Sequence, residues 1–309
     1  MKSAAERTDG GAAAGGAAAG PAVSVVVPVH NAAEFLPGTL EALLAQTLPS
    51  MEIVLSDDGS TDGSAALCRR FAAEHPGKVR VVEGPAAGVS VARNRALDAA
   101  RGEWIGFCDA DDVPYPDLYR RLLELAEREG ADLALCAFQW AHPGRKDGPA
   151  VAFPYRGTVV LEGRKDVERR FFLPLLRMAW GYRGNVFCGL FRRAAVEEAG
   201  LRFVPRLAVG EDHVFLLDYL LRARRVAATD EILYDYVQHP GNSCVRFKRE
   251  GEWRKRANAW RLARERLRIF KAWEGRWRHP LEGAKFRLRV VHRAFLCRQA
   301  RRAARKEGL

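Results

Sequence analysis

The chain has 309 residues, of which 48% are hydrophobic, so it is long enough for one large domain or two small ones. No run of about 18 apolar residues occurs, and we therefore expect no membrane-spanning helix. The six cysteines stand apart without a C-x-x-C pair, which argues against a zinc site and against a secreted disulfide scaffold. We expect a protein of the reducing cytoplasm.

The net charge of +12 is concentrated at the C-terminal end. Residues 245–309 contain 22 Lys and Arg against 6 Asp and Glu, a net charge of +16, whereas the rest of the chain has a net charge of −4. Such an asymmetry suggests a tail that meets an anionic surface. Residues 1–21 are rich in Ala and Gly and lack the apolar core of a signal peptide, so we expect them to form a disordered tail.

Apolar runs and helical periodicity alternate along the first half of the chain. Strands are predicted at 23–29, 52–56, 78–83, 104–108 and 132–138, and helices at 33–46, 63–74, 90–101 and 117–129. This alternation predicts an α/β fold with a mostly parallel, Rossmann-like sheet, right-handed crossovers and helices on its flanks.

A second region follows a segment rich in Gly, Pro and charge, which we expect to be a flexible loop at 142–157. Its pattern predicts helices at 164–177 and 193–199, a helix that starts after 209–213 and ends near 223, and strands at 186–191 and 231–237.

The run Trp104 to Cys108 leads directly into three acids, Asp109, Asp111 and Asp112. Residues i and i+2 of an extended chain point the same way, so Asp109 and Asp111 can face one ligand. Two close carboxylates need an opposite charge, which a divalent cation such as Mg²⁺ or Mn²⁺ supplies while it also binds substrate phosphates. The alternative is a solvated loop that caps the next helix.

Polar residues follow two further strands, at His30-Asn31 and at Asp57-Asp58. The carboxyl ends of parallel strands meet at one edge of a sheet, and ligands of open α/β sheets bind there. We therefore expect these residues and the acids after residue 108 to form one site.

The tail from about residue 251 has a helical pattern, with a break near His279-Pro280. Aromatic residues interleave with its arginines: Trp253, Trp260, Phe270, Trp273, Trp277 and Phe286. One interpretation is a basic amphipathic surface for anionic lipid headgroups. Another is a set of helices that pack an apolar stripe on the domain and leave the arginines in water. Nucleic acid is a third partner, which we do not expect.

Four segments together resemble the family 2 glycosyltransferases of bacterial type, which have the GT-A fold. They are Val23-Ser-Val-Val-Val-Pro-Val-His-Asn31, Asp57-Asp-Gly-Ser-Thr-Asp62, Gly88-Val-Ser-Val-Ala-Arg-Asn94 and Phe107-Cys-Asp-Ala-Asp-Asp112. Gly189-Leu-Phe-Arg-Arg193, Gly210-Glu-Asp212, Gln238-His239 and Ser243 look like the acceptor-side segments of the same family. The resemblance covers 22–245, with a nucleotide-binding half at 22–115 and an acceptor half at 116–245. It leaves 246–309 as a basic helical extension.

The resemblance implies an inverting, metal-dependent hexosyltransferase that moves a sugar from a nucleotide-sugar donor, with UDP-sugars favoured, to an acceptor hydroxyl. It implies donor-binding roles for Pro28, His30, Asn31, Asp57, Asp58, Arg93, Asn94, Asp109 and Asp111. Asp111, Asp109 and His239 are expected to bind Mg²⁺ or Mn²⁺, and Asp212 corresponds to the general base. The expected acceptor is a glycan or a lipid-linked precursor of a cell-surface polysaccharide, at the inner face of the membrane.

Each of these positions also has an ordinary structural interpretation. Asp57 and Asp58 could shape a turn and cap a helix, and Arg93 could be a surface arginine. Asp212 could be a helix N-cap, and His239 a loop histidine. At the level of function, the alternative is a nucleotide-binding or regulatory protein without turnover. A nucleotidyltransferase is disfavoured because Pro28-Val-His-Asn31 is not a Gly-rich, basic phosphate loop.

Overall fold

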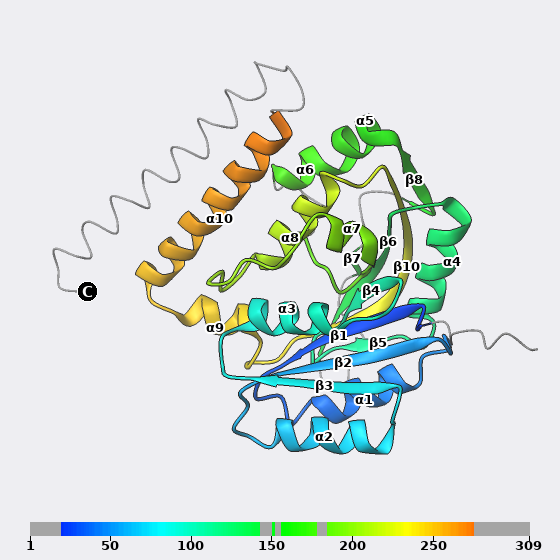
Figure 1. Cartoon of the computed structure of the whole chain (residues 1–309). Coiled ribbons are helices and arrows are strands. Elements are labelled where there is room, and N and C mark those ends of the chain that lie inside the picture. The colour runs from blue at the N-terminus through cyan, green and yellow to red at the C-terminus, as the bar shows by residue number, and fades with distance from the viewer. Residues whose placement is uncertain (1–19, 143–149, 152–155, 178–183, 275–309) are drawn as a thin grey trace, which may run out of the picture.

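The computed structural model describes residues 20–142, 150–151, 156–177 and 184–274 (Figure 1). One mixed sheet runs through this part of the chain in the order β3-β2-β1-β4-β9-β6-β10-β5, with β7 paired to β6 and β8 paired to β10. The expected tail at 1–21 lies almost wholly outside the described residues, and so does the expected break near His279-Pro280.

The N-terminal half of the sheet is parallel, as the alternation predicts. Its strands are β1 (Val23–Val29), β2 (Met51–Asp58), β3 (Val79–Gly84) and β4 (Trp104–Phe107). The connecting helices are α1 (Leu36–Leu44), α2 (Ser64–Glu74) and α3 (Val89–Ala99). β2 is longer than predicted, because Asp57 and Asp58 still pair with β3 and so occupy the last two positions of the strand.

The rest of the sheet departs from a parallel order. β9 (Gly189–Arg192) lies antiparallel between β4 and β6 (Leu133–Ala141). The remaining strands are β5 (Val113–Pro114), β7 (Ala150–Val151), β8 (Val159–Glu162) and β10 (Arg225–Val237). β7 falls inside the segment expected to be a loop, and its pairing with β6 extends the sheet there. Strand alternation predicts parallel neighbours joined by crossovers, so the strand predicted at 186–191 was expected, but its antiparallel position between β4 and β6 was not.

Within the described residues, the helices of the second half range from single turns to the 23 residues of α10. They are α4 (Leu118–Glu129), α5 (Gly163–Val167), a π-helical turn (Glu168–Phe172), α6 (Leu173–Leu176), α7 (Arg193–Glu198), α8 (Glu211–Leu220), α9 (Ser243–Arg249) and α10 (Glu252–Glu274).

Hydrophobic cores cover both faces of the sheet. Strand β4 shows the alternation, since Ile105 and Phe107 enter one core while Trp104 enters the other. Helices α1, α2 and α4 cover the face of Trp104, whereas α8 and α10 cover the opposite face (Figure 1). Burial on both faces explains why these strands consist of continuous apolar runs.

The described part of the basic extension packs on the domain. Ile269, Phe270 and Trp273 of α10 are buried in the same core as α8. This confirms a packing role for the apolar stripe of α10, while the opposite side of the helix remains in solvent, with Trp253 54% exposed. Across the described residues, no helix is both long enough and apolar enough to span a bilayer.

The closest packing in the first half of the sheet gives a stability prediction. A Cβ added at Gly106 would lie 2.4 Å from Cε1 of Tyr119, whose ring is fully buried. We expect Gly106→Ala to lower the free energy of unfolding by about 1–3 kcal/mol, measured by urea denaturation. Gly38→Ala in α1 is the control, because nothing lies within 4 Å of its added Cβ. Equal midpoints for Gly106→Ala and the wild type would contradict this packing.

Candidate active site

The acids after β4 are held in place by hydrogen bonds from other elements. Thr39 of α1 donates its hydroxyl to the carbonyl oxygens of Ala110, at 3.1 Å, and Asp112, at 2.9 Å. The amide of Cys108 donates to the carbonyl of Val26 at 3.0 Å, which continues the pairing with β1. The loop is therefore fixed to the carboxyl edge of the sheet, as the sequence predicts.

Asp112 differs from the other two acids because it is completely buried. Its carboxylate accepts hydrogen bonds from the Tyr234 hydroxyl and the Val237 amide, both at 2.8 Å. The same hydroxyl accepts a bond from the Asp109 amide at 3.2 Å. Burial raises the pKa of Asp112 well above its ordinary value, and the charges of Asp111 and Asp109 add to this effect. Asp112 therefore holds the loop that carries Asp109 and Asp111 against Tyr234 and Val237.

Asp111 meets the segment that follows β10. Its Oδ2 lies 2.8 Å from Nε2 of His239 and accepts a hydrogen bond from the side-chain Nδ2 of Asn242 at 3.1 Å. The His239 ring packs against Phe35, with ring centroids 4.1 Å apart. Burial raises the pKa of Asp111, and the nearby charge of Asp109 raises it further. The predicted pair of Asp111 and His239 is thus brought together across 128 residues of sequence.

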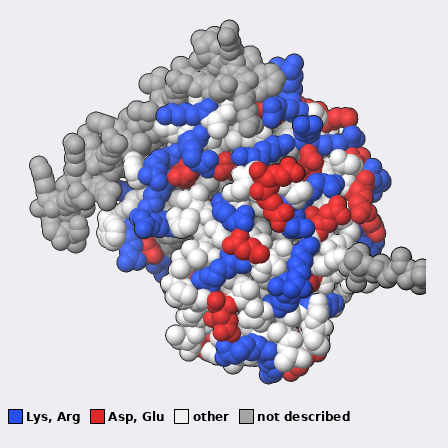
Figure 2. Space-filling view, in the orientation of Figure 1, with Lys and Arg blue, Asp and Glu red and all other residues white. Residues whose placement is uncertain are grey.

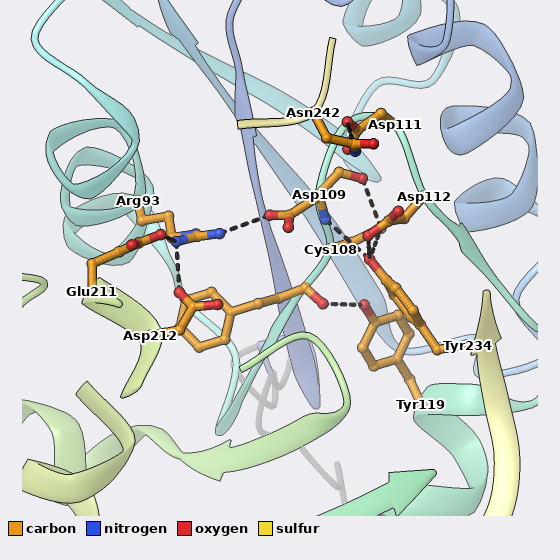
Figure 3. A network of polar contacts seen from close by, with 11 residues as sticks. Arg93, Cys108, Asp109, Asp111, Asp112, Tyr119, Glu211, Asp212, Tyr234 and Asn242 are labelled. Carbon is orange, nitrogen blue, oxygen red and sulfur yellow. Dashed lines mark hydrogen bonds and ion pairs between the residues drawn. The ribbon is translucent and has the colours of Figure 1, made fainter. Parts of the chain in front are cut away.

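Arg93 of α3 lies at the centre of the site, surrounded by carboxylates (Figure 3). Its Nη2 donates to Asp109 at 2.7 Å, and its Nη1 donates to Asp212 at 2.7 Å and to Glu211 at 2.9 Å. The side chain is only 3% exposed, which contradicts the interpretation of a surface arginine. Burial opposes its charge, but Asp212, Asp109 and Glu211 together raise the pKa of Arg93 above its ordinary value.

Asp212 occupies the second position of α8 and faces Arg93. The N-cap of this helix is Gly210, with φ of +94°, so Asp212 is not the N-cap residue. Burial raises the pKa of Asp212 well above its ordinary value; Arg93 acts against that shift, while Glu211 and Asp109 increase it. A carboxylate with a raised pKa is suited to accept a proton from a reacting hydroxyl.

The neighbouring strand ends form a second part of the site. His30 Nδ1 lies 2.8 Å from the carbonyl oxygen of Asp58. The Asp58 carboxylate accepts bonds from the Ala87 and Gly88 amides and from Arg95, so it holds the loop before α3. This bears out a structural role for Asp58 and leaves a donor contact as a prediction.

Only one of the two carboxylate oxygens of Asp57 has hydrogen-bond partners among the described residues. Its Oδ2 accepts the amides of Gly59 and Ser60, which is the turn geometry that short acids favour. Its Oδ1 is buried and has no hydrogen-bond partner among the described residues. A buried acceptor without a donor is costly, so this oxygen lacks a partner that an N–H group of a ligand could supply, but it is closed off from solvent in this structure.

The remaining predicted residues have local roles. Pro28 is buried in β1, and Asn31 has φ of +50° and accepts the Thr61 amide at 2.8 Å. Asn94 donates to the Phe203 carbonyl at 2.9 Å and accepts the Phe203 amide at 2.8 Å. Both groups of the Asn94 amide are thus engaged with the loop before α8, and its contact with a donor stays a prediction.

The contacts also identify residues that sequence reasoning missed. Arg95, Tyr234 and Asn242 donate hydrogen bonds to the predicted acids, and Glu211 accepts one from Arg93. Glu211 and Asn242 lie within segments already singled out, so proximity to Asp212 and His239 was an available signal. Tyr234 lies inside a strand and Arg95 one position beyond a motif, and nothing in their local pattern marks them.

Comparison with known proteins identifies relatives. A model of glycosyl transferase family 2 matches residues 24–198. The uncharacterized glycosyltransferase YibD of Escherichia coli is 32% identical over 233 residues, which cover 74% of this chain and 64% of that protein. The uncharacterized glycosyltransferase EpsJ of Bacillus subtilis is 33% identical, with coverages of 72% and 62%. The succinoglycan biosynthesis protein ExoO of Rhizobium meliloti is 30% identical, also with coverages of 72% and 62%. This chain thus spans less than two thirds of the length of these relatives.

Solved structures share the fold at lower identity. S. aureus TarS 1–349 in complex with UDP-GlcNAc superposes with a TM-score of 0.64 at 20% identity, over 79% of this chain and 66% of that chain. The mannosyltransferase PcManGT from Pyrobaculum calidifontis in complex with GDP-Man and Mn²⁺ gives a TM-score of 0.51 at 19% identity, over 90% of this chain and 84% of that chain. The fold is therefore GT-A, as the sequence resemblance predicts.

The burial of Arg93 gives a prediction for stability and its pH dependence. We expect Arg93→Met to lower the free energy of unfolding by about 3–5 kcal/mol at neutral pH, because it leaves buried carboxylates without their cation. Burial already raises the pKa of Asp212, and loss of Arg93 removes the charge that acts against this shift, so the cost of ionising Asp212 grows as pH rises and shrinks as pH falls. The loss should therefore be smaller at about pH 5 than at about pH 7.5.

The measurement is urea denaturation at the two pH values. Arg202→Met is the matched control, because Arg202 pairs with Asp98 at 2.5 Å while both side chains are well exposed. Its loss should stay below about 1 kcal/mol at both pH values. A similar loss in the two variants would show that Arg93 is not a buried charge.

Proposed function

The chain belongs to glycosyl transferase family 2, and we propose that it transfers a sugar from a nucleotide-sugar donor to an acceptor hydroxyl with inversion. The observation that carries this proposal is the convergence of Asp109 and Asp212 on Arg93. One acid comes from the donor side of the sheet and the other from the acceptor side, so donor and acceptor would meet at this guanidinium.

We place the nucleoside diphosphate along the carboxyl edge of β1, β2 and β4. The free Oδ1 of Asp57 offers an acceptor to the N–H of a base. A UDP-sugar is the favoured donor, and the binding of UDP-GlcNAc by the structurally similar TarS supports this choice. Asp109 would lie toward the ribose, and Arg93 and Asn94 would border the sugar.

The acids fit a divalent cation, Mg²⁺ or Mn²⁺. No three His, Cys, Asp or Glu side chains gather into a complete metal cage within the described ranges. Mg²⁺ is commonly bound by one or two carboxylates together with substrate phosphates and water, and Asp111 with Asp109 matches such a partial site. A cation there would also relieve the repulsion that raises the pKa of Asp111. His239, whose Nε2 lies 2.8 Å from Asp111, is a further proposed ligand, while Asp109 would have to turn from Arg93 to share the same cation. The bound metal would supply positive charge to the leaving diphosphate.

Asp212 is the proposed general base. Its carboxylate would take the proton of the acceptor hydroxyl as the oxygen attacks the anomeric carbon from the face opposite the diphosphate. A single displacement inverts the anomeric configuration, so an α-linked donor gives a β-linked product. Arg93 orients Asp212 through one short hydrogen bond at 2.7 Å.

The proposed acceptor is a glycan or a lipid-linked glycan precursor in polysaccharide synthesis. The relative ExoO, named for succinoglycan biosynthesis, supports this class of product. We propose that the enzyme works in the cytoplasm, at the inner face of the membrane. The support is a line of Lys and Arg side chains that follows the position of α10 (Figure 2), with the exposed Trp253 at the start of that helix.

A donor screen tests the function. UDP, GDP, dTDP and CMP are added with and without Mn²⁺, and the thermal midpoint of unfolding is measured. A ligand that binds only the folded state raises the midpoint, so we expect one nucleotide to give a metal-dependent shift. Asp111→Asn should lose this shift. Asp212→Asn should keep it but lose sugar transfer by at least about 100-fold, because only the base is removed.

The two variants separate an enzyme from a nucleotide-binding protein without turnover. Asp98→Asn is the control, since Asp98 is an exposed acid outside the site. Full transfer activity in Asp212→Asn would reject the assigned base. Nucleotide binding without transfer in the wild type, across the sugars of the selected nucleotide, would favour the regulatory alternative.

Membrane docking has its own test, by sedimentation with lipid vesicles. We expect binding to vesicles that contain phosphatidylglycerol and weaker binding to pure phosphatidylcholine, because basic residues near an anionic surface each contribute about 1 kcal/mol. Trp253→Ala should weaken vesicle binding several-fold, since Trp favours the interface. Arg202→Ala, at an exposed arginine outside α10, is the control. Equal binding to both vesicle types, or none, would reject this surface.

A further inference from the structure

Helix α10 lies outside the residues that match the family model, yet it contacts the segment that leads into the proposed base. That segment, 206–210, ends at Gly210, directly before Glu211 and Asp212. The contacts come from successive turns of one side of α10, at Asn258 and at Arg261 and Leu262.

Asn258 forms a two-bond bracket with the backbone of this segment. Its Oδ1 accepts the Ala208 amide at 2.8 Å, and its Nδ2 donates to the Val209 carbonyl at 2.9 Å. The side chain is buried, with the residue only 5% exposed. Loss of the bracket would leave a buried donor and a buried acceptor without partners, which costs free energy.

The next turn of α10 completes the support. Arg261 donates to the Arg206 carbonyl at 2.9 Å. Leu262 packs so closely on Gly210 that a Cβ at that glycine would lie 3.1 Å from a Leu262 methyl carbon.

The segment needs such support because of its backbone. Arg206 has φ of +70°, and Gly210 has φ of +94°. The left-handed region is unfavourable for a residue with a side chain and persists where the surroundings determine it. The two positive φ values turn the chain into α8, and therefore the direction of this turn sets the position of Asp212.

We propose that Asn258 is a positioning residue for catalysis. It fixes the backbone at 208–209 so that Asp212 lies at the correct place beside Arg93 and the acceptor. This inference rests on the proposed role of Asp212 as the base. It makes α10 part of the catalytic unit, even though this helix supplies no group to the reacting atoms.

A purely structural role is the alternative, in which Asn258 only attaches α10 to the domain. The two roles differ in what they change. A structural role lowers the thermal midpoint without a selective effect on turnover. A positioning role lowers kcat, while the KM for the donor stays the same because the donor edge is built from β1, β2 and β4.

The test uses Asn258→Ala in the full chain. We expect kcat for transfer to fall about 10- to 100-fold, since displacement of a catalytic group by about 1 Å has effects of this size. The donor KM and the metal-dependent nucleotide shift should stay within about twofold of the wild type. Hydrogen exchange of peptides covering 206–212 should become faster, because the Ala208 amide loses its acceptor. Glu124→Ala, at an exposed acid of α4 outside the proposed sites, is the control and should change neither kcat nor exchange.

Asn258→Asp provides a milder second variant. It keeps an acceptor for the Ala208 amide and should therefore recover part of the kcat that Asn258→Ala loses, even if the alanine variant folds poorly. Unchanged kcat or unchanged exchange in both Asn258 variants would overturn the positioning role. The failure of the proposed function looks different, because in that case Asp212→Asn itself retains transfer activity.

Discussion

The burial of one guanidinium among carboxylates is the constraint on which the site depends. Arg93 can be buried only because Asp109, Glu211 and Asp212 surround it, and these acids can approach one another only because Arg93 lies between them. The three acids come from the β4 edge and from the start of α8, so the pairing links the two halves of the fold. Neither half forms this arrangement alone.

Carboxylates outnumber basic side chains at this edge, and the excess of negative charge favours a bound cation. Asp111 and Asp112 lie beside Asp109, and burial together with mutual repulsion raises the pKa values of both. Tyr234 and the Val237 amide satisfy Asp112 with neutral donors. Among the described residues Asp111 is bonded by His239 and Asn242, and it is therefore the acid with the most to gain from a cation. The proposed metal thus follows from an imbalance of charge in addition to the resemblance.

The sequence predicted the parallel half of the sheet well, because buried strands such as β1 are continuous apolar runs and the helices between them are periodic. It predicted the strand at 186–191 that corresponds to β9, but not its antiparallel insertion between β4 and β6, which depends on partners distant in the chain. The same limit applies to the site. Asp109, Asp111 and Asp212 were identified from short motifs, whereas Tyr234 is recognisable only once β10 is placed beside the acids. Arg93 was assigned to the donor site, but its pairing with Glu211 and Asp212 spans more than 100 residues and has no local signature.

Helix α10 shows how a shared fold can depend on residues outside its common motifs. The predicted boundary at 245 separates the family-like region from the basic extension, yet α10 buries Ile269, Phe270 and Trp273 in the core of α8. Apolar burial of this kind contributes about 25 cal/mol per Å², so α8 would lose much of its packing without the helix. Because α8 also carries Asp212, α10 affects both the packing of α8 and the position of the proposed base. The two proposals therefore give the faces of α10 separate tasks: the inner face would support the base, and the outer, basic face would meet a membrane that presents the acceptor.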